Sequence, residues 1–503
     1  MEIKTSDLVS LFEKSLANAP EQDLHEIGFV VQVGDSFCKI LGLKNAIYGE
    51  LVTFDKGNQG IVMDLGQDYI SIFLLNSQIP VAELEIVKRT GSVFKIPVGT
   101  KLLGRILNAI GTPIDSLGTI DYEELKPIEV RIPSIIERSP INTSLETGIL
   151  VIDALIPVGR GQRELIIGNR GTGKTAIAID TILHQKGLNV YCIYVSIGQR
   201  QANLAKIVRL LEENGALEYS VIISADAAEA SLNRYLAPYA ACTIAEFFRD
   251  QGKDVLIVYD DLSNHAIAYR EMALLMRRPP GREAYPGDIF YLHSRLLERA
   301  GKLASGGSIT ALPIVQIQAD DITAYIATNL ISITDGQIFL DTKLYNAGIR
   351  PAVNVELSVS RVGGSAQTPA VKNMSKSLRL ELAQYQELLG FSQFGTELDI
   401  ISQKKLARGA IAYELLKQKQ YITYSFVDHA LMLFLLRFNF LDQLELSKVN
   451  KFAHEFISYI KSVYPDLYNE ILNSKNITEE QIKTLKTLAM EFGNIYGSLK
   501  PNI

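Results

Sequence analysis

The pattern of hydrophobic and polar residues changes twice along the chain, and each change predicts a different kind of structure. From about residue 27 to residue 89, short runs of β-branched and aromatic residues, broken by Gly or Asn, recur about every ten residues. The runs are GFVVQV, SFCKILGL, GELVTF, GIVMDL and YISIFLL. Short strands at even spacing are typical of a small β-barrel or β-sandwich.

The middle of the chain, roughly residues 91–370, alternates apolar runs with stretches of helical pattern. The apolar runs include ELIIG, VYCIYVSI, VLIVYDD, ITALPIV and LISITDG. This alternation predicts a mostly parallel sheet covered by helices. Beyond about residue 371, amphipathic helical pattern dominates, as in SKSLRLELAQYQELLGF and KKLARGAIAYELLKQ, and it predicts a C-terminal helix bundle.

We therefore expect a multidomain protein, and its 503 residues leave room for roughly three domains. Residues 1–90 are expected to form a short helix over 5–18, capped by Thr5 or Ser6, followed by the barrel. Residues 91–370 are expected to form the central α/β domain, and residues 371–503 the helical bundle.

Composition and charge exclude several classes of protein. The net charge is −6, without a basic block, which argues against non-specific binding of nucleic acid. The longest apolar runs, such as Ala430–Leu436, are far shorter than the ~20 residues of a membrane-spanning helix. The mixed, acidic N-terminal stretch does not have the pattern of a signal or transit peptide, so we expect an intracellular protein.

Cysteine and histidine usage gives no sign of redox or metal chemistry. Cys38, Cys192 and Cys242 are an odd number of cysteines without CxxC spacing, so we expect them to be reduced and buried. The six histidines form no HExxH motif, which makes a protein-held zinc site improbable.

The most specific chemical motif is GNRGTGKT, which follows the apolar run Glu164–Ile167 and opens the predicted helix Lys174–His184. A glycine-rich loop between a strand and a helix is a P-loop, whose backbone N–H groups and helix N-terminus bind phosphates. Lys174 is expected to reach the β- and γ-phosphates, and the Thr175 hydroxyl to ligate Mg²⁺. The predicted nucleotide-binding residues of this loop are Gly168, Asn169, Arg170, Gly171, Thr172, Gly173, Lys174 and Thr175.

Two further strand ends complete the predicted Mg-nucleotide site. VLIVYDD delivers Asp260 at the end of a buried strand, where its carboxylate can hold Mg²⁺ through a bound water molecule. Asp260 is preferred to Asp261 because it comes first off the strand. VYCIYVSIGQR places Gln199 where a hydrolytic site needs a carboxylate to polarise the attacking water. From the residues alone, Gln199 is equally compatible with a site whose base lies elsewhere.

Taken together, these motifs resemble the alpha-subunit family of F-type ATP synthases. The resemblance rests on GRGQRELIIGNRGTGKTAIAIDTIL, IYVSIGQR, the block from Asp260 to Ala300, ISITDGQIFL, GIRPAVNVELSVSRVGGSAQ and LLKQKQY, which occur in order over nearly the whole chain. It implies a β-barrel, a RecA-like P-loop NTPase domain and a helical bundle. In this family the catalytic beta subunit has a glutamate at the position of Gln199, so the chain looks like a non-catalytic subunit.

The resemblance also implies roles for residues outside the P-loop. Arg361 in SVSR is the expected arginine finger, acting in trans on a neighbouring catalytic site, with Ser358 and Ser332 close to that shared interface. The adenine pocket maps onto a set of four residues: Tyr345, Arg350, Gln418 and Gln420. Packed or surface positions remain the plain alternative for these four. Asn169 and Gly171 depart from the family pattern GDRQTGKT, and the Gly lacks a side chain that would contact phosphate or a water on Mg²⁺.

The implied assembly is a ring in which alpha and beta subunits alternate around a central gamma stalk, joined to a peripheral stalk with delta and, indirectly, to an ion-translocating membrane sector. Mg²⁺ and ATP or ADP are the expected ligands. The expected location is peripheral, on the cytoplasmic face of a bacterial membrane or the matrix face of the mitochondrial inner membrane. The alternatives are a self-sufficient RecA-like hexameric motor, of Rho or secretion type, and a purely structural module. Gln199 and the acidic net charge argue against a self-sufficient motor, and the intact P-loop argues against a purely structural module.

Overall fold

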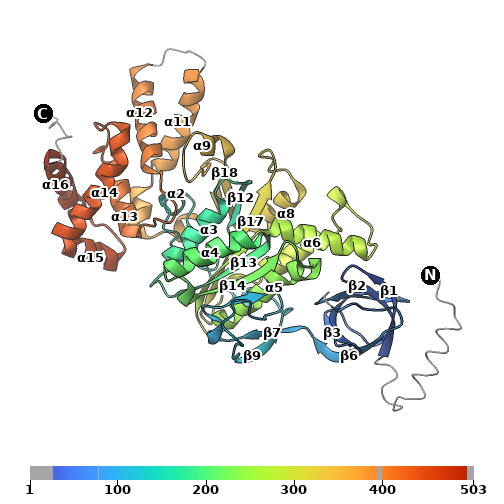
Figure 1. Cartoon of the computed structure of the whole chain (residues 1–503). Helices are drawn as coiled ribbons and strands as arrows, with labels where there is room; N and C mark the ends of the chain where they lie inside the picture. Colours follow the sequence, from blue (N-terminus) through green and yellow to red (C-terminus); the bar gives the residue numbers. More distant parts are fainter. Residues whose placement is uncertain (1–26, 77–78, 394–398, 496–503) are drawn as a thin grey trace.

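The computed structural model describes residues 27–76, 79–393 and 399–495. It shows the three predicted parts, with a barrel at one end, an α/β domain in the middle and a helical domain at the other end (Figure 1). The predicted helix over 5–18 lies outside the described residues. The last barrel strand ends at Val93 and the first C-terminal helix begins at Pro369, so the changes of structure fall near residues 90 and 370.

The N-terminal domain is a closed antiparallel barrel, with strand order β1-β2-β5-β4-β3-β6. Its strands are β1 (Ile27–Gly34), β2 (Phe37–Gly42), β3 (Glu50–Phe54), β4 (Gln59–Leu65), β5 (Ile70–Leu74) and β6 (Ile86–Val93). Burial alternates along β3, where Val52 and Phe54 face the interior. Alternating residues therefore fill the barrel, and closure leaves no free strand edge.

The central domain is built on one large sheet, in the order β19-β18-β12-β17-β15-β13-β14-β8, with β16 beside β17. Neighbouring strands from β18 to β8 are parallel, and β19 pairs antiparallel at one edge. The strands of the sheet are β8 (Ile106–Asn108), β12 (Leu165–Asn169), β13 (Val190–Gln199), β14 (Ser220–Asp226), β15 (Asp254–Asp260), β16 (Gly301–Lys302), β17 (Ser308–Ile317), β18 (Gly336–Leu340) and β19 (Val359–Ser360). Small two-stranded pairs are formed by β7 (Lys95–Val98) with β9 (Glu124–Pro127), and by β10 (Ser144–Leu145) with β11 (Val158–Gly159).

Helices cover both faces of this sheet, so successive residues of one strand enter different cores. In β12, Leu165 and Ile167 pack in the core shared with α5 and the outer barrel wall, whereas Ile166 packs in the core shared with α3 and the C-terminal helices. The helices of this domain are α2 (Leu150–Leu155), α3 (Lys174–His184), α4 (Gln201–Glu213), α5 (Ser231–Asp250), α6 (Leu262–Leu275), α7 (Ile289–Leu297), α8 (Tyr325–Ile333) and α9 (Thr342–Asn346). Burial on both faces explains the continuous apolar runs of the central strands.

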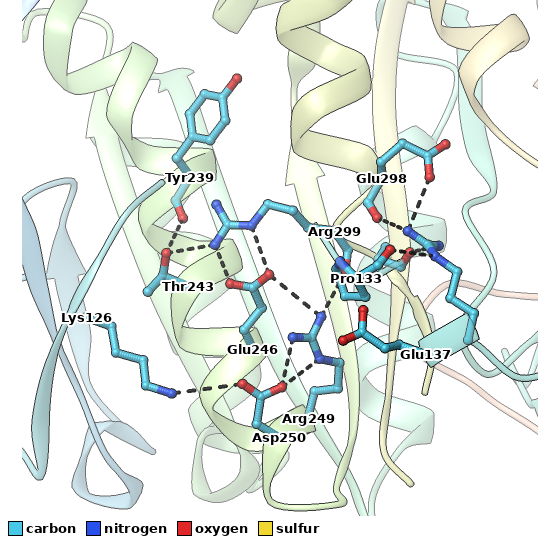
Figure 2. A network of polar contacts seen from close by, with 12 residues as sticks. Lys126, Pro133, Glu137, Tyr239, Thr243, Glu246, Arg249, Asp250, Glu298 and Arg299 are labelled. Atoms are coloured by element: carbon cyan, nitrogen blue, oxygen red, sulfur yellow. Dashed lines mark hydrogen bonds and ion pairs between the residues drawn. The ribbon is translucent and has the colours of Figure 1, made fainter. Parts of the chain in front are cut away.

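A buried ion-pair network fixes α5 against the segment after α7 (Figure 2). Arg299 donates to both carboxylate oxygens of Glu246, at 3.0 and 2.5 Å, and to the carbonyl of Ile128 at 2.7 Å. Arg249 donates to the carbonyl of Arg299 and pairs with Asp250 at 2.8 Å. The network joins chain segments that lie far apart in the sequence. Arg299 and Glu246 are almost fully buried, so water does not weaken their ion pair.

The C-terminal domain is helical throughout its described residues. Its helices are α10 (Pro369–Met374), α11 (Leu378–Gln393), α12 (Ile400–Leu415), α13 (Phe426–Arg437), α14 (Leu446–Val463), α15 (Pro465–Ser474) and α16 (Glu479–Ile495). α13 is buried along nearly its whole length and forms the centre of this domain. Across the parts of the chain that the structure describes, no helix combines the length and apolarity that a membrane crossing requires.

The three cysteines, Cys38, Cys192 and Cys242, are buried and form no disulfide, as the sequence predicts. Burial raises the pKa of each thiol, to about 12 for Cys38 and about 11 for Cys242. A high pKa keeps a thiol in its unreactive protonated form. Within the described ranges there is no group of three or more His, Cys, Asp or Glu residues that could hold a metal ion.

Candidate functional site

The glycine-rich loop connects the carboxyl end of β12 to the first residue of α3. Gly171 and Gly173 have φ angles of 80° and 104°, which residues with a side chain adopt only with strain. An added Cβ would meet nothing within 4 Å at either position, so the loop needs these glycines for backbone conformation and not for lack of space. This conformation lets the loop wrap around the N-terminus of α3, where N–H groups and the helix dipole favour an anion.

Lys174 is held in the middle of this loop. Its ammonium donates to the carbonyls of Gly168 and Asn169, at 2.9 and 2.5 Å, and the side chain is buried. Burial lowers the pKa of Lys174 to about 8, although Asp261 and Asp260 oppose this shift. A cation that is poorly compensated in a buried loop is suited to bind a polyanion such as a phosphate chain.

Thr175 and Asp260, the predicted Mg²⁺ ligands, lie side by side. The Thr175 hydroxyl donates to Asp260 Oδ2 at 2.7 Å, and the Tyr194 hydroxyl donates to the same oxygen at 2.9 Å. Burial raises the pKa of Asp260, while these hydrogen bonds oppose the shift. Asp261 instead caps α6 by accepting from Asn264 N–H at 2.8 Å. A hydroxyl beside a carboxylate is an oxygen donor set that fits Mg²⁺.

Gln199 ends β13 next to this pair. Its side-chain amide donates to the carbonyl of Asp260 at 3.2 Å and to the Tyr194 hydroxyl at 3.5 Å. The structure therefore places an uncharged amide beside Asp260 and Thr175. Such a group can hold a water molecule, but it lacks the charge with which a carboxylate draws a proton from it.

A pocket that is open to solvent continues from the P-loop along α3 towards the C-terminal domain. Its lining includes Thr172, Gly173, Asp180, Tyr345, Arg350 and Gln420. The Arg350 guanidinium lies 4.5 Å from the centre of the Tyr345 ring, a cation–π contact that forms a flat wall. Four residues predicted for adenine binding, which also include Gln418, thus line one pocket that is continuous with the phosphate loop.

Gln418 has a different local role from the one that we expected. Its amide nitrogen donates to the carbonyls of Gly148 and Ile422, at 2.7 and 2.6 Å, and its oxygen accepts from Leu150 N–H at 3.0 Å. The amide is thus engaged by backbone groups and cannot read the edge of a base without breaking these bonds. Gln420 is exposed at the rim of the pocket.

Arg361 lies far from this P-loop. It follows β19, its side chain is exposed, and its backbone N–H donates to the carbonyl of Asp335 at 2.8 Å, just before β18 begins. The P-loop is at the other end of β18, because Gly168 pairs with Leu340. The five residue steps from Asp335 to Leu340 span about 16 Å of strand, so the backbone of Arg361 is anchored at the end of β18 that is remote from its own chain's phosphate loop.

The two serines near Arg361 differ in exposure. Ser332 is exposed, and its hydroxyl donates to Thr328 O at 2.9 Å. Ser358 is fully buried; its hydroxyl donates to Asn354 O at 2.5 Å and accepts from Phe339 N–H at 2.9 Å. The hydroxyl of Ser358 is thus engaged inside the chain, whereas that of Ser332 lies at the surface, and the expected position of both serines close to a shared interface stays a prediction.

The comparisons with known proteins agree over nearly the whole chain. Three family models match: the ATP synthase alpha/beta family β-barrel domain over residues 24–91, its nucleotide-binding domain over 148–360 and its C-terminal domain over 367–492. A protein from Caldanaerobacter subterraneus subsp. tengcongensis named ATP synthase subunit alpha is 49% identical over 502 residues, 99% of each chain. The chain belongs to the ATP synthase alpha-subunit family. Proteins of the same name from Clostridium botulinum and Acetivibrio thermocellus are 49% and 48% identical over 99% of each chain.

Two residues of the loop, Asn169 and Gly171, were expected to depart from the family pattern of the alpha subunits, and their surroundings differ. The Asn169 amide donates to the Thr342 hydroxyl at 2.9 Å and accepts from Asp320 N–H at 3.1 Å. This side chain ties the loop to α9 and to the segment after β17. Arg170 and Gly171 are exposed at the outer turn of the loop.

Sequence reasoning missed two functional candidates in this alpha-subunit chain. Tyr194 contacts Asp260, but in the sequence it is one aromatic residue within a buried strand. Asp180 lines the pocket, and its position on the same face of α3 as the P-loop residues was the available signal.

Proposed function

We propose that this chain, an alpha subunit of ATP synthase, holds Mg-ATP at its own P-loop without turning it over and supplies Arg361 to the catalytic site of a neighbouring beta subunit. The proposal rests on two residues at opposite ends of the sheet: the amide of Gln199 lies beside the P-loop, and the exposed Arg361 lies at the other end of β18. Nucleotide binding and catalytic assistance would thereby be divided between opposite ends of the sheet in one domain.

Nucleotide binding is supported by the contacts around the loop. The N–H groups at the start of α3 and the Lys174 ammonium would bind the phosphates, and the pocket behind Tyr345 and Arg350 would take the base. Thr175 and Asp260 would hold Mg²⁺, which, when bound, neutralises charge on the phosphate oxygens.

The absence of turnover follows from the chemistry of Gln199. Hydrolysis requires a group that orients a water molecule and draws its proton. The Gln199 amide donates its hydrogen atoms to the Asp260 carbonyl and the Tyr194 hydroxyl, and it has no charge at neutral pH. A nucleotide at this site would therefore be kept, not cleaved.

The action of Arg361 in trans follows from its geometry. A guanidinium presents a planar, permanent positive charge that matches the oxygens of a transferring phosphoryl group. About 16 Å of strand separates the backbone partner of Arg361 from the chain's own P-loop, so the phosphate that it assists must belong to another subunit.

The proposed partners are catalytic beta subunits that alternate with this chain in a ring, the central gamma stalk and the peripheral stalk with its delta subunit. The link to the ion-translocating membrane sector is indirect. We propose a peripheral position on the membrane face that makes or consumes ATP, cytoplasmic in a bacterium and matrix-facing in a mitochondrion.

The experiment is to purify the chain alone and to measure Mg-ATP binding by calorimetry and hydrolysis by phosphate release. We expect binding with negligible hydrolysis, and loss of binding in Lys174→Ala. Gln199→Glu should bind Mg-ATP and still hydrolyse it negligibly, because no neighbouring arginine is present. Robust turnover by the isolated wild-type chain would favour the self-sufficient hexameric motor and contradict the proposal.

A further inference from the structure

The phosphate loop begins where three parallel strands, β12, β17 and β18, end together. Asn169 is the last residue of β12 and pairs with Ile317 at the end of β17, while Gly168 pairs with Leu340 at the end of β18. The segment after β17 and helix α9 after β18 therefore flank the loop on its two sides. Asn169 lies where polar groups from both neighbours can reach the loop.

Hydrogen bonds of the Asn169 side chain connect the loop with both neighbours. Asp320 N–H donates to Asn169 Oδ1 at 3.1 Å, and Asn169 Nδ2 donates to Thr342 Oγ1 at 2.9 Å. The Thr342 hydroxyl in turn donates to Asp320 Oδ1 at 3.0 Å. A backbone N–H can only donate, so it fixes the orientation of the amide, and the single hydroxyl hydrogen goes to the carboxylate. We call Asn169, Thr342 and Asp320 the Asn169 relay.

The Asn169 relay holds backbone on both sides of the loop. Ala319 and Asp320 have φ angles of 53° and 56°, which residues with a side chain adopt only with strain, so contacts must hold this segment in place. The carbonyl of Asn169 accepts from the Lys174 ammonium at 2.5 Å and from the Thr172 hydroxyl at 2.8 Å. The same residue thus fixes the segment after β17 with its side chain and the phosphate-binding lysine with its carbonyl.

We propose that Asn169 is a positioning residue of the phosphate loop, whose amide, through the Asn169 relay, sets the carbonyls that hold Lys174 at the phosphate site. The inference rests on the proposed nucleotide site. It also explains why an amide replaces the acid of the family pattern GDRQTGKT. An ionised carboxylate only accepts, so an acid here would compete with Asp320 for the one hydroxyl hydrogen of Thr342. It would also add a negative charge beside the bound phosphates.

The test measures Mg-ATP binding to the complete purified chain by calorimetry. Asn169→Asp should weaken binding at least about tenfold, because the unpaired acceptor loosens the loop and its charge repels the phosphates. Asn473→Asp, at an exposed residue of α15, adds the same charge elsewhere and should leave binding unchanged. Equal binding of Mg-ATP by Asn169→Asp and wild type would overturn the inference.

Adenosine separates a role at the phosphates from a general role in the fold. It has no phosphate that could reach the loop, so wild type and Asn169→Asp should bind it alike when binding is followed by ligand-observed NMR. Equal losses for Mg-ATP and adenosine would show that Asn169 only supports the fold, and the inference would be wrong.

The matched exchange combines Asn169→Asp with Asp320→Asn and reverses the direction of the relay. The amide at position 320 can donate to Thr342, whose hydroxyl can donate to the carboxylate at position 169. We expect this double variant to bind Mg-ATP within about threefold of wild type. Asp320→Asn alone should do the same, because its side-chain oxygen still accepts from Thr342. If Asp320→Asn alone tightens binding by as much as the double variant recovers, net charge governs binding, and the inference is wrong.

Thermal unfolding checks that each variant is folded. If Asn169→Asp does not fold, Asn169→Ala takes its place, since it removes the relay without adding a charge. Asn169→Ala should weaken Mg-ATP binding at least about fivefold, and binding equal to that of wild type would overturn the inference. A wild-type chain that binds no Mg-ATP would instead show that the proposed nucleotide site is wrong, and the inference would fall with it.

Discussion

Replacing Glu246 with Gln should destabilise the central domain by about 3–5 kcal/mol, because the substitution leaves the Arg299 guanidinium buried without a counter-charge. Arg299 and Glu246 are 2% and 3% exposed and share two hydrogen bonds, at 2.5 and 3.0 Å (Figure 2). Two further donations, to Ile128 O at 2.7 Å and Thr243 Oγ1 at 2.9 Å, fix the guanidinium in place. It therefore cannot turn to solvent when its partner is removed.

The double replacement Glu246→Leu with Arg299→Met should recover part of this loss. It removes both charges and leaves the Ile128 carbonyl and the Thr243 hydroxyl without their donor, at a cost of about 1 kcal/mol each. The resulting coupling between the two positions should exceed about 1 kcal/mol.

The assay is native-state hydrogen exchange of slowly exchanging amides in α5 and β15, which reports opening of this domain without assuming that all three domains unfold together. The control is Glu213→Gln, which breaks the exposed pair of Arg209 with Glu213 on α4 and should cost only about 0.3–0.5 kcal/mol. If Glu246→Gln costs no more than this control, the buried pair does not stabilise the domain in the way described.

Three other predictions concern the P-loop and the segment behind Arg361. Burial holds the pKa of Lys174 near 8, so the affinity for Mg-ATP should be constant below pH 8 and fall by at most about tenfold per pH unit above it. Calorimetry that found a constant affinity between pH 7 and 9.5 would show that the Lys174 ammonium does not bind the phosphates. Gly171→Gln should cost about 1 kcal/mol of stability at φ 80° and tighten Mg-ATP binding up to about tenfold, whereas unchanged or weaker binding would show that the added amide reaches no phosphate or Mg²⁺ ligand. Burial raises the pKa of Glu164 well above its usual range, so the wild-type chain loses stability as the pH rises above the ordinary pKa of a glutamate, and Glu164→Gln removes this loss. Thermal unfolding should therefore find the variant more stable than wild type at pH 7, with a smaller difference at pH 4; a variant that is less stable than wild type at pH 7 would contradict this reasoning.

The sequence predicted those features that depend on local pattern. The barrel strands follow from short β-branched and aromatic runs that are broken by Gly or Asn, and the P-loop follows from an apolar strand, a glycine-rich turn and a helix start, all within one short segment. The pairing of Thr175 with Asp260 was also predictable, because the carboxyl ends of the parallel strands of one sheet lie at the same edge of that sheet.

The features that sequence reasoning missed depend on contacts between distant segments. Gln418 is engaged by Gly148 and Leu150, which are more than 260 positions earlier in the chain. The orientation of Ser358 is set by its bonds to Asn354 and Phe339, whose positions follow from strand pairing. A motif states which residue types are present, but not whether their polar atoms are already satisfied within the fold.

The most direct test of the division of labour compares Arg361→Ala with wild type in two preparations, the isolated chain and the ring reconstituted with beta and gamma subunits. An exposed arginine on α4, Arg209→Ala, serves as the control. We predict that the isolated variant binds Mg-ATP as tightly as wild type, while the ATPase rate of its ring falls by about 10³–10⁵-fold. Loss of Mg-ATP binding by the isolated variant, or a ring that keeps its wild-type rate, would contradict the account.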